Sequence, residues 1–308
     1  MKAALALTLA LLPFALSPPP AHQELEPNDD SAHANRLEIG RRVGGLLGVT
    51  PLGNAATVNG HIDPGDVDYF ALYARAGDVL TAAVTEPARG ELHDPVLAVF
   101  GPGDSLAVAR NDDGGPHFLP RLAVPIDRSG LWTLAVRAFA DAALEGRARR
   151  ASFDYTLVAS LSTEPARVQE RDGKVRNDDP RHADLALLTP ASLVWSEPTV
   201  VTGTLTRGDS DYFVLAVPRG AVLSAAVFDD AQGEYDDTIL RVLDWDGTVL
   251  AQDDDSGPGF LSNLVLPRDD SHARVLLLAL TGFDSDAADA HPHRESFRYR
   301  LVVSFAAQ

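Results

Sequence analysis

Short runs of alternating apolar and polar residues recur along most of the chain. The clearest runs begin at Phe70, Leu80, Leu97, Trp132 and Tyr155. Because successive side chains of a β-strand point to opposite faces, each run predicts a strand with one face packed on a core. Clusters of Gly, Pro, Asp and Asn, such as those at 63–66 and 101–104, separate the runs and predict tight turns. We therefore expect an all-β fold, with residues 32–37 as the candidate for a short helix.

The whole pattern occurs twice. Residues 60–72 recur as 203–215, and both copies contain Asp-x-Asp-Tyr-Phe. The same offset of 143 residues relates later segments in the same order. These are 94–97 with 237–240, 111–112 with 254–255, 132–136 with 275–279 and, with one residue more, 153–157 with 297–301. An offset that is kept over so many turns predicts two homologous units.

The repeat and the short strands together predict two tandem jelly-roll-like β-sandwich domains. Many short strands at regular spacing within about 140 residues are typical of a sandwich or a jelly roll. We place the first domain at 24–162 and the second at 172–308, with a polar linker at 163–171.

The first 21 residues have the pattern of a secretory signal peptide. Met1-Lys2 is followed by an almost wholly apolar stretch from Ala3 to Leu16 and then by small residues and prolines up to Ala21. A basic start, a short apolar run and small residues after it are typical of an export signal. The apolar run is too short to span a bilayer comfortably. We therefore expect a secreted or periplasmic protein without a membrane span.

Composition excludes several classes of protein. The 308 residues include 44 acidic and 26 basic side chains, a net charge of −18, and no cysteine. The missing cysteine excludes a disulfide framework, thiolate-ligated metals and a thiol nucleophile. A pI of 4.7 argues against nucleic acid as a partner, because nucleic-acid binders carry a basic surface.

No familiar catalytic motif is present. The chain lacks Gly-x-Ser-x-Gly, His-Glu-x-x-His and a phosphate-binding glycine loop. Gly103-Asp104-Ser105-Leu106 spells a lipase signature, but the second copy reads Asp-Gly-Thr-Val at 246–249. A shared turn explains both segments, so we expect no enzymatic activity.

An ordered set of motifs resembles a known family. Residues 24–29 read Glu-Leu-Glu-Pro-Asn-Asp. They precede Gly60-x-Ile62, Asp66-x-Asp68-x-Phe70, Asp94-x-x-Leu97, Gly130-x-Trp132 and Tyr155-x-Leu157. In this order they resemble the bacterial pre-peptidase C-terminal (PPC) domain, and the resemblance covers both copies. It implies a jelly-roll-type β-sandwich, related to the collagen-binding domains of clostridial collagenases, that accompanies a secreted peptidase and is not itself catalytic. We find no peptidase domain in the sequence.

The acidic N-terminal segment is the best candidate for a metal site. Calcium prefers six to eight hard oxygen ligands, which Glu, Asp and Asn supply. Alternate side chains of an extended segment point the same way, so three residues of the segment 24–29 could face one ion. The resemblance to collagen-binding domains implies calcium ligands at Glu24, Glu26, Asn28 and Asp29, with Asp66 and Asp68 as partners. The alternative is that these residues cap turns through side-chain to backbone hydrogen bonds.

The second copy has lost part of this pattern. The sequence offset that relates Asn28 to Asn177 places Gly173 and Val175 where the first copy has Glu24 and Glu26. The residues retained are Asn177, Asp178, Asp209 and Asp211. We expect weak calcium binding or none in the second copy.

These observations favour a secreted, non-catalytic binding or accessory protein, with calcium stabilising its first domain. The expected partner is an extracellular protein or polysaccharide, or a separately encoded secreted peptidase. One alternative is a secreted hydrolase whose site no motif reveals, and another is a structural protein without a ligand. An exposed aromatic strip on one sheet would favour a binding protein.

Overall fold

Strands are the only regular elements in the described part of the chain, which confirms the all-β prediction. The computed structural model describes residues 21–39, 55–85, 94–112, 119–139, 152–163, 165–170, 177–184, 198–206, 208–229, 236–257, 259–282 and 296–307. Nearly all of the predicted signal peptide at 1–21 lies outside these ranges. None of the described segments forms a helix that could cross a membrane.

The first half of the chain forms two five-stranded sheets. Sheet A has the order β1-β3-β10-β5-β8, and sheet B has the order β2-β4-β9-β6-β7. The strands of sheet A are β1 (His22–Gln23), β3 (Ala55–Ile62), β5 (Val79–Thr85), β8 (Arg121–Pro125) and β10 (Phe153–Ser162). The strands of sheet B are β2 (Asn35–Arg36), β4 (Val67–Ala74), β6 (Pro95–Phe100), β7 (Ala109–Asn111) and β9 (Gly130–Ala138).

The second half repeats this arrangement with its own two sheets. Sheet C has the order β11-β12-β19-β14-β17, and sheet D has the order β13-β18-β15-β16. The strands of sheet C are β11 (Ala166–Gln169), β12 (Thr199–Thr206), β14 (Ala221–Asp229), β17 (Asn263–Leu266) and β19 (Ser296–Ala307). The strands of sheet D are β13 (Ser210–Val217), β15 (Thr238–Leu243), β16 (Val249–Asp253) and β18 (Arg274–Gly282). No named strand pairs across the two halves.

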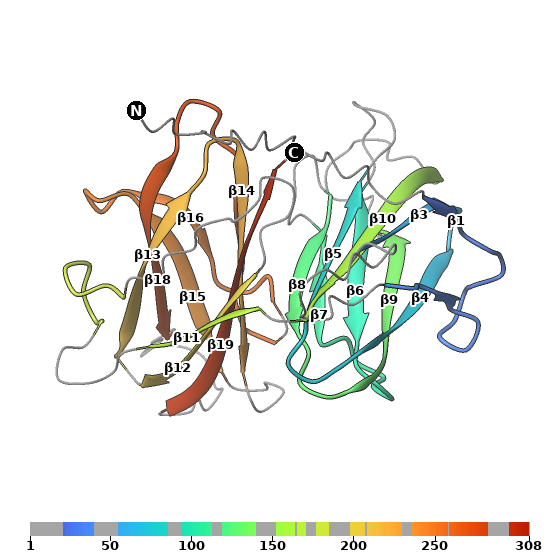
Figure 1. The fold of residues 1–308 in the computed structure, drawn as a ribbon, viewed down its shortest axis with the longest axis horizontal. Coiled ribbons are helices and arrows are strands. Elements are labelled where there is room, and N and C mark those ends of the chain that lie inside the picture. The colour runs from blue at the N-terminus through green and yellow to red at the C-terminus, as the bar shows by residue number, and fades with distance from the viewer. Residues whose placement is uncertain are drawn as a thin grey trace, which may run out of the picture.

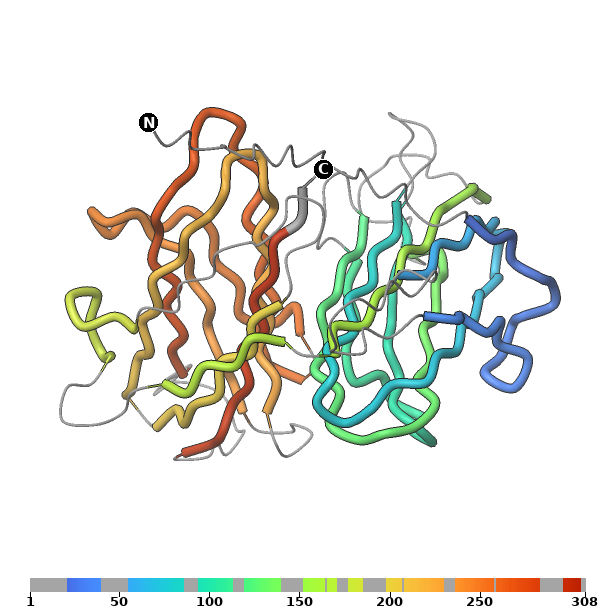
Figure 2. The backbone as a smooth tube through the Cα atoms, viewed as in Figure 1, coloured from blue at the N-terminus to red at the C-terminus, as the bar shows by residue number. Residues whose placement is uncertain are grey.

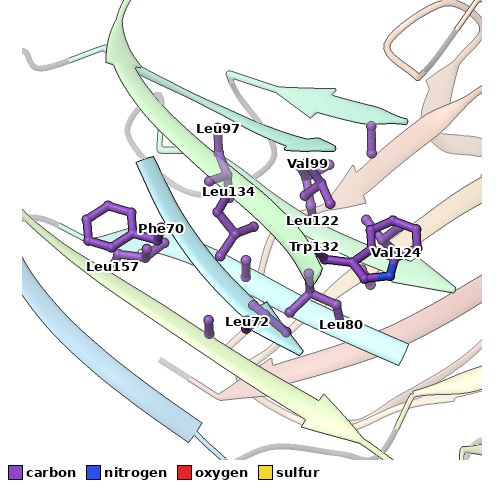
Figure 3. Close-up of a cluster of buried hydrophobic side chains, with 14 of the residues drawn as sticks. Phe70, Leu72, Leu80, Leu97, Val99, Leu122, Val124, Trp132, Leu134 and Leu157 are labelled. Atoms are coloured by element: carbon purple, nitrogen blue, oxygen red, sulfur yellow. The ribbon is translucent and has the colours of Figure 1, made fainter. Parts of the chain in front are cut away.

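Each pair of sheets encloses an apolar core. In the first half, Phe70 and Leu134 of sheet B face Leu80 and Leu157 of sheet A, with Trp132 buried between the sheets (Figure 3). Leu215 and Leu278 of sheet D and Leu223 and Leu301 of sheet C form the corresponding core of the second half. The period-two pattern thus delivers one apolar face per sheet, as a sandwich requires.

The two halves lie side by side and contact each other (Figure 1). Val200, Ala226 and Val302 form one row across sheet C, on the face away from its own core. They and Phe228 belong to the buried apolar cluster of the first half, because β8 packs against β14 and β19. The Arg167 guanidinium also donates to the Gly77 carbonyl at 2.7 Å.

Two local predictions differ from the structure. Residues 166–169, which we expected in the linker, form β11 and pair in parallel with β12. The short helix expected over 32–37 is instead a turn followed by β2. The Asp30 carboxylate accepts hydrogen bonds from the backbone N–H groups of Ala32 and His33, which closes the turn before a helix can propagate.

The sequence repeat also misplaces one strand by a residue. Leu276, not Val275, is the counterpart of Trp132, because Val275 pairs with Ala216 as Leu131 pairs with Tyr73. Val275 is 51% exposed, whereas Leu276 is 2% exposed. Residues 275–280 are all apolar, so their pattern cannot reveal which face is buried, and a one-residue slip reverses every side chain.

This register predicts that one of two neighbouring truncations is strongly destabilising and that the other has little effect. Leu276→Ala removes core contacts and should reduce the free energy of unfolding by about 2–5 kcal/mol. Val275→Ala removes an exposed side chain and should change it by no more than about 0.5 kcal/mol. Urea unfolding of the two variants measures the difference. A larger loss for Val275→Ala would show that the inner face carries Val275.

Candidate metal centre

The N-terminal segment crosses from one sheet to the other. The Glu24 N–H donates to the Asn59 carbonyl of β3 at 3.0 Å, which aligns the segment with sheet A. The Tyr69 N–H of β4 donates to the Asn28 carbonyl at 3.0 Å, which fixes the other end of the segment on sheet B. Figure 2 shows this segment in blue, at the side of the first half away from the second half. Residues 24–28 therefore connect sheet A to sheet B at the open edge of the sandwich, where β1 and β2 are the edge strands.

Three carboxylates converge where the segment crosses. One oxygen each from Glu24, Glu26 and Asp68 lies within 4.8 Å of the other two. Glu24 and Asp68 are buried, whereas Glu26 is exposed and leaves the group open to solvent on one side. The backbone N–H of His61 donates to Glu24 Oε1 at 2.5 Å and holds that carboxylate in place.

The Tyr155 hydroxyl links two of these carboxylates, those of Glu24 and Asp68. It lies 2.6 Å from Asp68 Oδ2 and 3.1 Å from Glu24 Oε2. A side chain at position 60 would overlap both the Tyr155 ring and the Glu24 carboxylate, which explains Gly60 in β3. Sequence reasoning missed Tyr155 as a site residue. The signal was present, since both copies have a glycine and a tyrosine at these positions.

Among the described residues, no arginine, lysine or histidine forms an ion pair with the three carboxylates of the cluster. A phenol has one proton, so Tyr155 can donate to only one of its two carboxylate neighbours. Burial, reinforced by the nearby Glu24 carboxylate, raises the pKa of Asp68 to about 8. Burial is also the main cause of a raised pKa at Glu24. A proton or a cation is therefore needed among these oxygens.

Asn28 faces the same group. Its side-chain oxygen is directed at the acceptors of Asp68 and Glu26, an unfavourable arrangement. Rotating the amide by 180° would let its nitrogen donate to Asp68 Oδ1 at 3.0 Å and to Glu26 Oε2 at 3.1 Å. The donor set consists of hard oxygens and thus fits calcium.

The structure brings together most of the predicted ligands. Glu24, Glu26 and Asp68 form the cluster, and Asn28 contacts it. Asp29 and Asp66 lie apart from it, as a pair of neighbouring carboxylates. The hydrogen bond with Asp66 raises the pKa of Asp29. The Asp66 carboxylate also accepts from the Asp63 N–H at 3.4 Å, which is consistent with the turn-capping alternative for this residue.

The second half has an equivalent site that the sequence alignment concealed. The Tyr299 hydroxyl lies 2.6 Å from Glu170 Oε2 and 2.8 Å from Asp211 Oδ2. The Glu170 N–H donates to the Thr202 carbonyl at 3.0 Å and Glu170 Oε1 accepts from the Thr204 N–H at 2.5 Å, as Glu24 does with Asn59 and His61.

Glu170, rather than Gly173, is therefore the counterpart of Glu24, which corrects the sequence alignment. Gly173 and Val175 lie outside the described residues. The chain between Glu170 and Asn177 is three residues longer than that between Glu24 and Asn28, so a fixed offset fails there.

The second site differs from the first in its number of carboxylates and in the hydrogen bonding of its asparagine. No third carboxylate joins Glu170 and Asp211 among the described residues. Burial, with the neighbouring Glu170 carboxyl group, raises the pKa of Asp211 to about 9. The Asn177 side chain is 1% exposed, and neither of its amide atoms has a hydrogen-bond partner. With its pKa raised by burial to about 9, Asp211 favours its protonated form at neutral pH.

The acidic turns that begin at Asn111 in the first half and at Asp253 in the second half have a structural role. Asn111 Oδ1 accepts from the Arg121 N–H at 3.0 Å, and Asp253 Oδ1 accepts from the Asn263 N–H at 2.6 Å. Asn111 thus corresponds to Asp253, one residue from the match in the sequence repeat. The lipase-like segment 103–106 lies in the β6–β7 connection, where the Asp104 N–H closes a turn on the Gly101 carbonyl at 3.1 Å. Both segments are turns, as predicted from their presence in both copies of the repeat.

Comparisons with known proteins add little. No protein-family profile and no curated protein matches the chain. A solved structure of PliG, a periplasmic inhibitor of g-type lysozyme from Aeromonas hydrophila, is 20% identical and matches 42% of this chain and 97% of its own, with a TM-score of 0.28. A complex of the plant peptide RALF23 with FER and LLG2 is 9% identical over 78% of this chain and 80% of its own, with a TM-score of 0.24. The PPC resemblance stays a prediction from the residues.

The raised pKa of Asp211 predicts a pH dependence of stability. Between the unfolded pKa near 4 and the folded pKa near 9, the native state binds more protons than the unfolded state, so stability falls as pH rises. Asp211→Asn removes this titration and supplies an amide that can donate to Glu170. The variant should lose less melting temperature than the parent between pH 5 and pH 9. Thermal unfolding monitored by circular dichroism measures both slopes.

An exposed aspartate provides the control for that comparison. Asp254→Asn makes the same chemical change on the surface and should leave the slope of the parent unchanged. An equally steep slope in Asp211→Asn and the parent would contradict a buried proton at Asp211.

Proposed function

We propose that the chain is an exported, non-catalytic β-sandwich protein that binds or assists an extracellular partner, with calcium stabilising its first half. The observation that carries the calcium site is the convergence of Glu24, Glu26 and Asp68 on a segment that joins sheets A and B. A divalent cation there would neutralise carboxylates that otherwise repel one another. It would also fix the N-terminal segment across the open edge of the sandwich.

The donor chemistry favours calcium over other metals. All candidate ligands are carboxylate or amide oxygens, and neither histidine nor cysteine takes part. Oxygen ligands suit calcium and magnesium, whereas zinc and copper prefer nitrogen and sulfur. The exposed Glu26 leaves room for water ligands, which a calcium site of six to eight oxygens requires. Extracellular calcium modules bind at about 0.1–1 mM, which suits an exported protein.

The binding role rests on the export signal, the family resemblance and the absence of a familiar catalytic motif. An exported sandwich without cysteine must gain its stability from packing and ions. Its partner would be an extracellular protein, a polysaccharide or a secreted peptidase. A hydrolase activity lost on a single point change would overturn the non-catalytic assignment.

Calcium should raise the melting temperature of the protein. At 10 mM calcium, a site of about 0.1–1 mM affinity adds roughly 1.4–2.7 kcal/mol of stability through mass action. Glu26→Gln removes one ligand charge at an exposed position and should abolish most of this gain. Differential scanning calorimetry in calcium and in EDTA measures the shift.

Glu38→Gln is the matched control, because Glu38 is an exposed glutamate outside the cluster. It should retain the full calcium response. Equal melting temperatures of the parent in calcium and EDTA would refute the calcium site. A response that survives both substitutions would place the ion elsewhere.

A further inference from the structure

The outer face of sheet B, directed away from the core, has an unusual composition. Strand register puts the same-side residues of its five strands in rows. One row runs Arg36, Ala71, Thr133 and Phe100, and the next runs Tyr69, Ala135, Ala98 and Arg110. Each row thus carries an aromatic ring towards one side of the sheet and an arginine at the opposite edge, with small residues between them.

The aromatic side chains of this face differ in exposure, because Tyr73 is exposed whereas Tyr69 and Phe100 are half-buried. Tyr73 is 59% exposed and lies opposite Leu131 of β9, which is 37% exposed. The rings of Tyr69 and Phe100 lie 6.5 Å apart between centroids, across the row of small residues. A chain of sugar rings offers apolar C–H faces that can pack on such rings. Tyr73 is the exposed member of this aromatic group, and the other two rings are partly accessible.

The charge of this face is opposite to that of the protein. Arg36, Arg110 and Arg137 point outward from β2, β7 and β9, and no aspartate or glutamate shares the face in the described strands. None of the three guanidinium groups forms an ion pair with a described residue. In a chain with a net charge of −18, a carboxylate-free face with three available arginines is complementary to an anionic ligand.

The second half provides an internal control. At the corresponding positions of sheet D, register places Ala216 for Tyr73, Leu243 for Phe100, Gln252 for Arg110 and Thr281 for Arg137. Tyr212 matches Tyr69, and Arg241 stands in place of Ala98. Both halves nevertheless keep apolar residues on the inner face. The fold therefore does not require Tyr73, Phe100, Arg110 or Arg137 at these positions.

We propose that the outer face of sheet B binds a linear acidic polysaccharide. Its sugar rings would pack on Tyr73, Tyr69 and Phe100, and its carboxylate or sulfate groups would pair with the arginines, whose planar guanidinium matches both anions. A polymer that repeats an apolar ring and a negative group fits a surface that repeats an aromatic ring and an arginine. The inference rests on the proposed binding role, but it requires neither calcium nor the cluster at Glu24.

Isothermal titration of the full chain with heparin and hyaluronan oligosaccharides tests the proposal, with neutral chitohexaose and poly-glutamate as comparison ligands. We expect binding of at least one acidic polysaccharide, weakened by salt, and no binding of chitohexaose. Tyr73→Ala, Arg110→Ala and Arg137→Ala should each weaken that binding about 3- to 10-fold. Trp245→Ala and Arg268→Ala remove an exposed aromatic and an exposed arginine from the second half and should have no effect.

The outcomes separate this inference from the proposed calcium site. Binding that is equal in calcium and EDTA supports the inference even if calcium fails to raise the melting temperature. No binding of either acidic polysaccharide, or binding unaffected by the three substitutions, overturns it. Tighter binding of poly-glutamate than of both polysaccharides would overturn the polysaccharide in favour of an acidic peptide. Unchanged circular dichroism of each variant shows that a loss of binding is not a loss of fold.

Discussion

In each half, one tyrosine hydroxyl lies between two buried carboxylates that come from opposite sides of the sandwich. Tyr155 joins Glu24 to Asp68, and Tyr299 joins Glu170 to Asp211. The glutamate accompanies sheet A or C and the aspartate belongs to sheet B or D, so the hydroxyl ties the two sheets at their open edge. Because a phenol supplies one proton to two acceptors, each site needs a further positive charge. This shared requirement makes an otherwise ordinary β-sandwich sensitive to protons and cations at its N-terminal segment.

The two halves meet this requirement differently. The first half adds Glu26 to the pair and places the Asn28 amide against Glu26 and Asp68. The second half shows only the pair Glu170 and Asp211 in its described part, and one proton satisfies it. The difference follows from the chain between glutamate and asparagine, which is longer in the second half. A common architecture thus brings three carboxylates together in one copy and, among the described residues, two in the other.

The sequence predicted the strands well because alternation and turn residues are local signals. It located Glu24, Glu26 and Asp68 through the family resemblance, but it missed Tyr155, since no local pattern relates residues that are 87 or more positions apart. It failed where local signals were degenerate. The apolar run containing Val275 has no alternation from which to read a face, and the longer connection before Asn177 hid Glu170. The domain boundaries at 24–162 and 172–308 stay predictions, and packing of the two halves through β8 shows that the halves contact each other.

The apolar surface of the first half can be assigned face by face. The inner faces of sheets A and B form its core, and β8 packs against the row of Val200, Ala226 and Val302 on sheet C. That contact accounts for apolar residues on an outer face of the second half. No described contact of this kind covers Tyr73 or Leu131, which stay exposed on sheet B. The repeat shows that the fold does not need Tyr73, since Ala216 occupies its position in the second half. Neither the core nor the contact between the halves requires Tyr73, so its side chain is available for the polysaccharide proposed above.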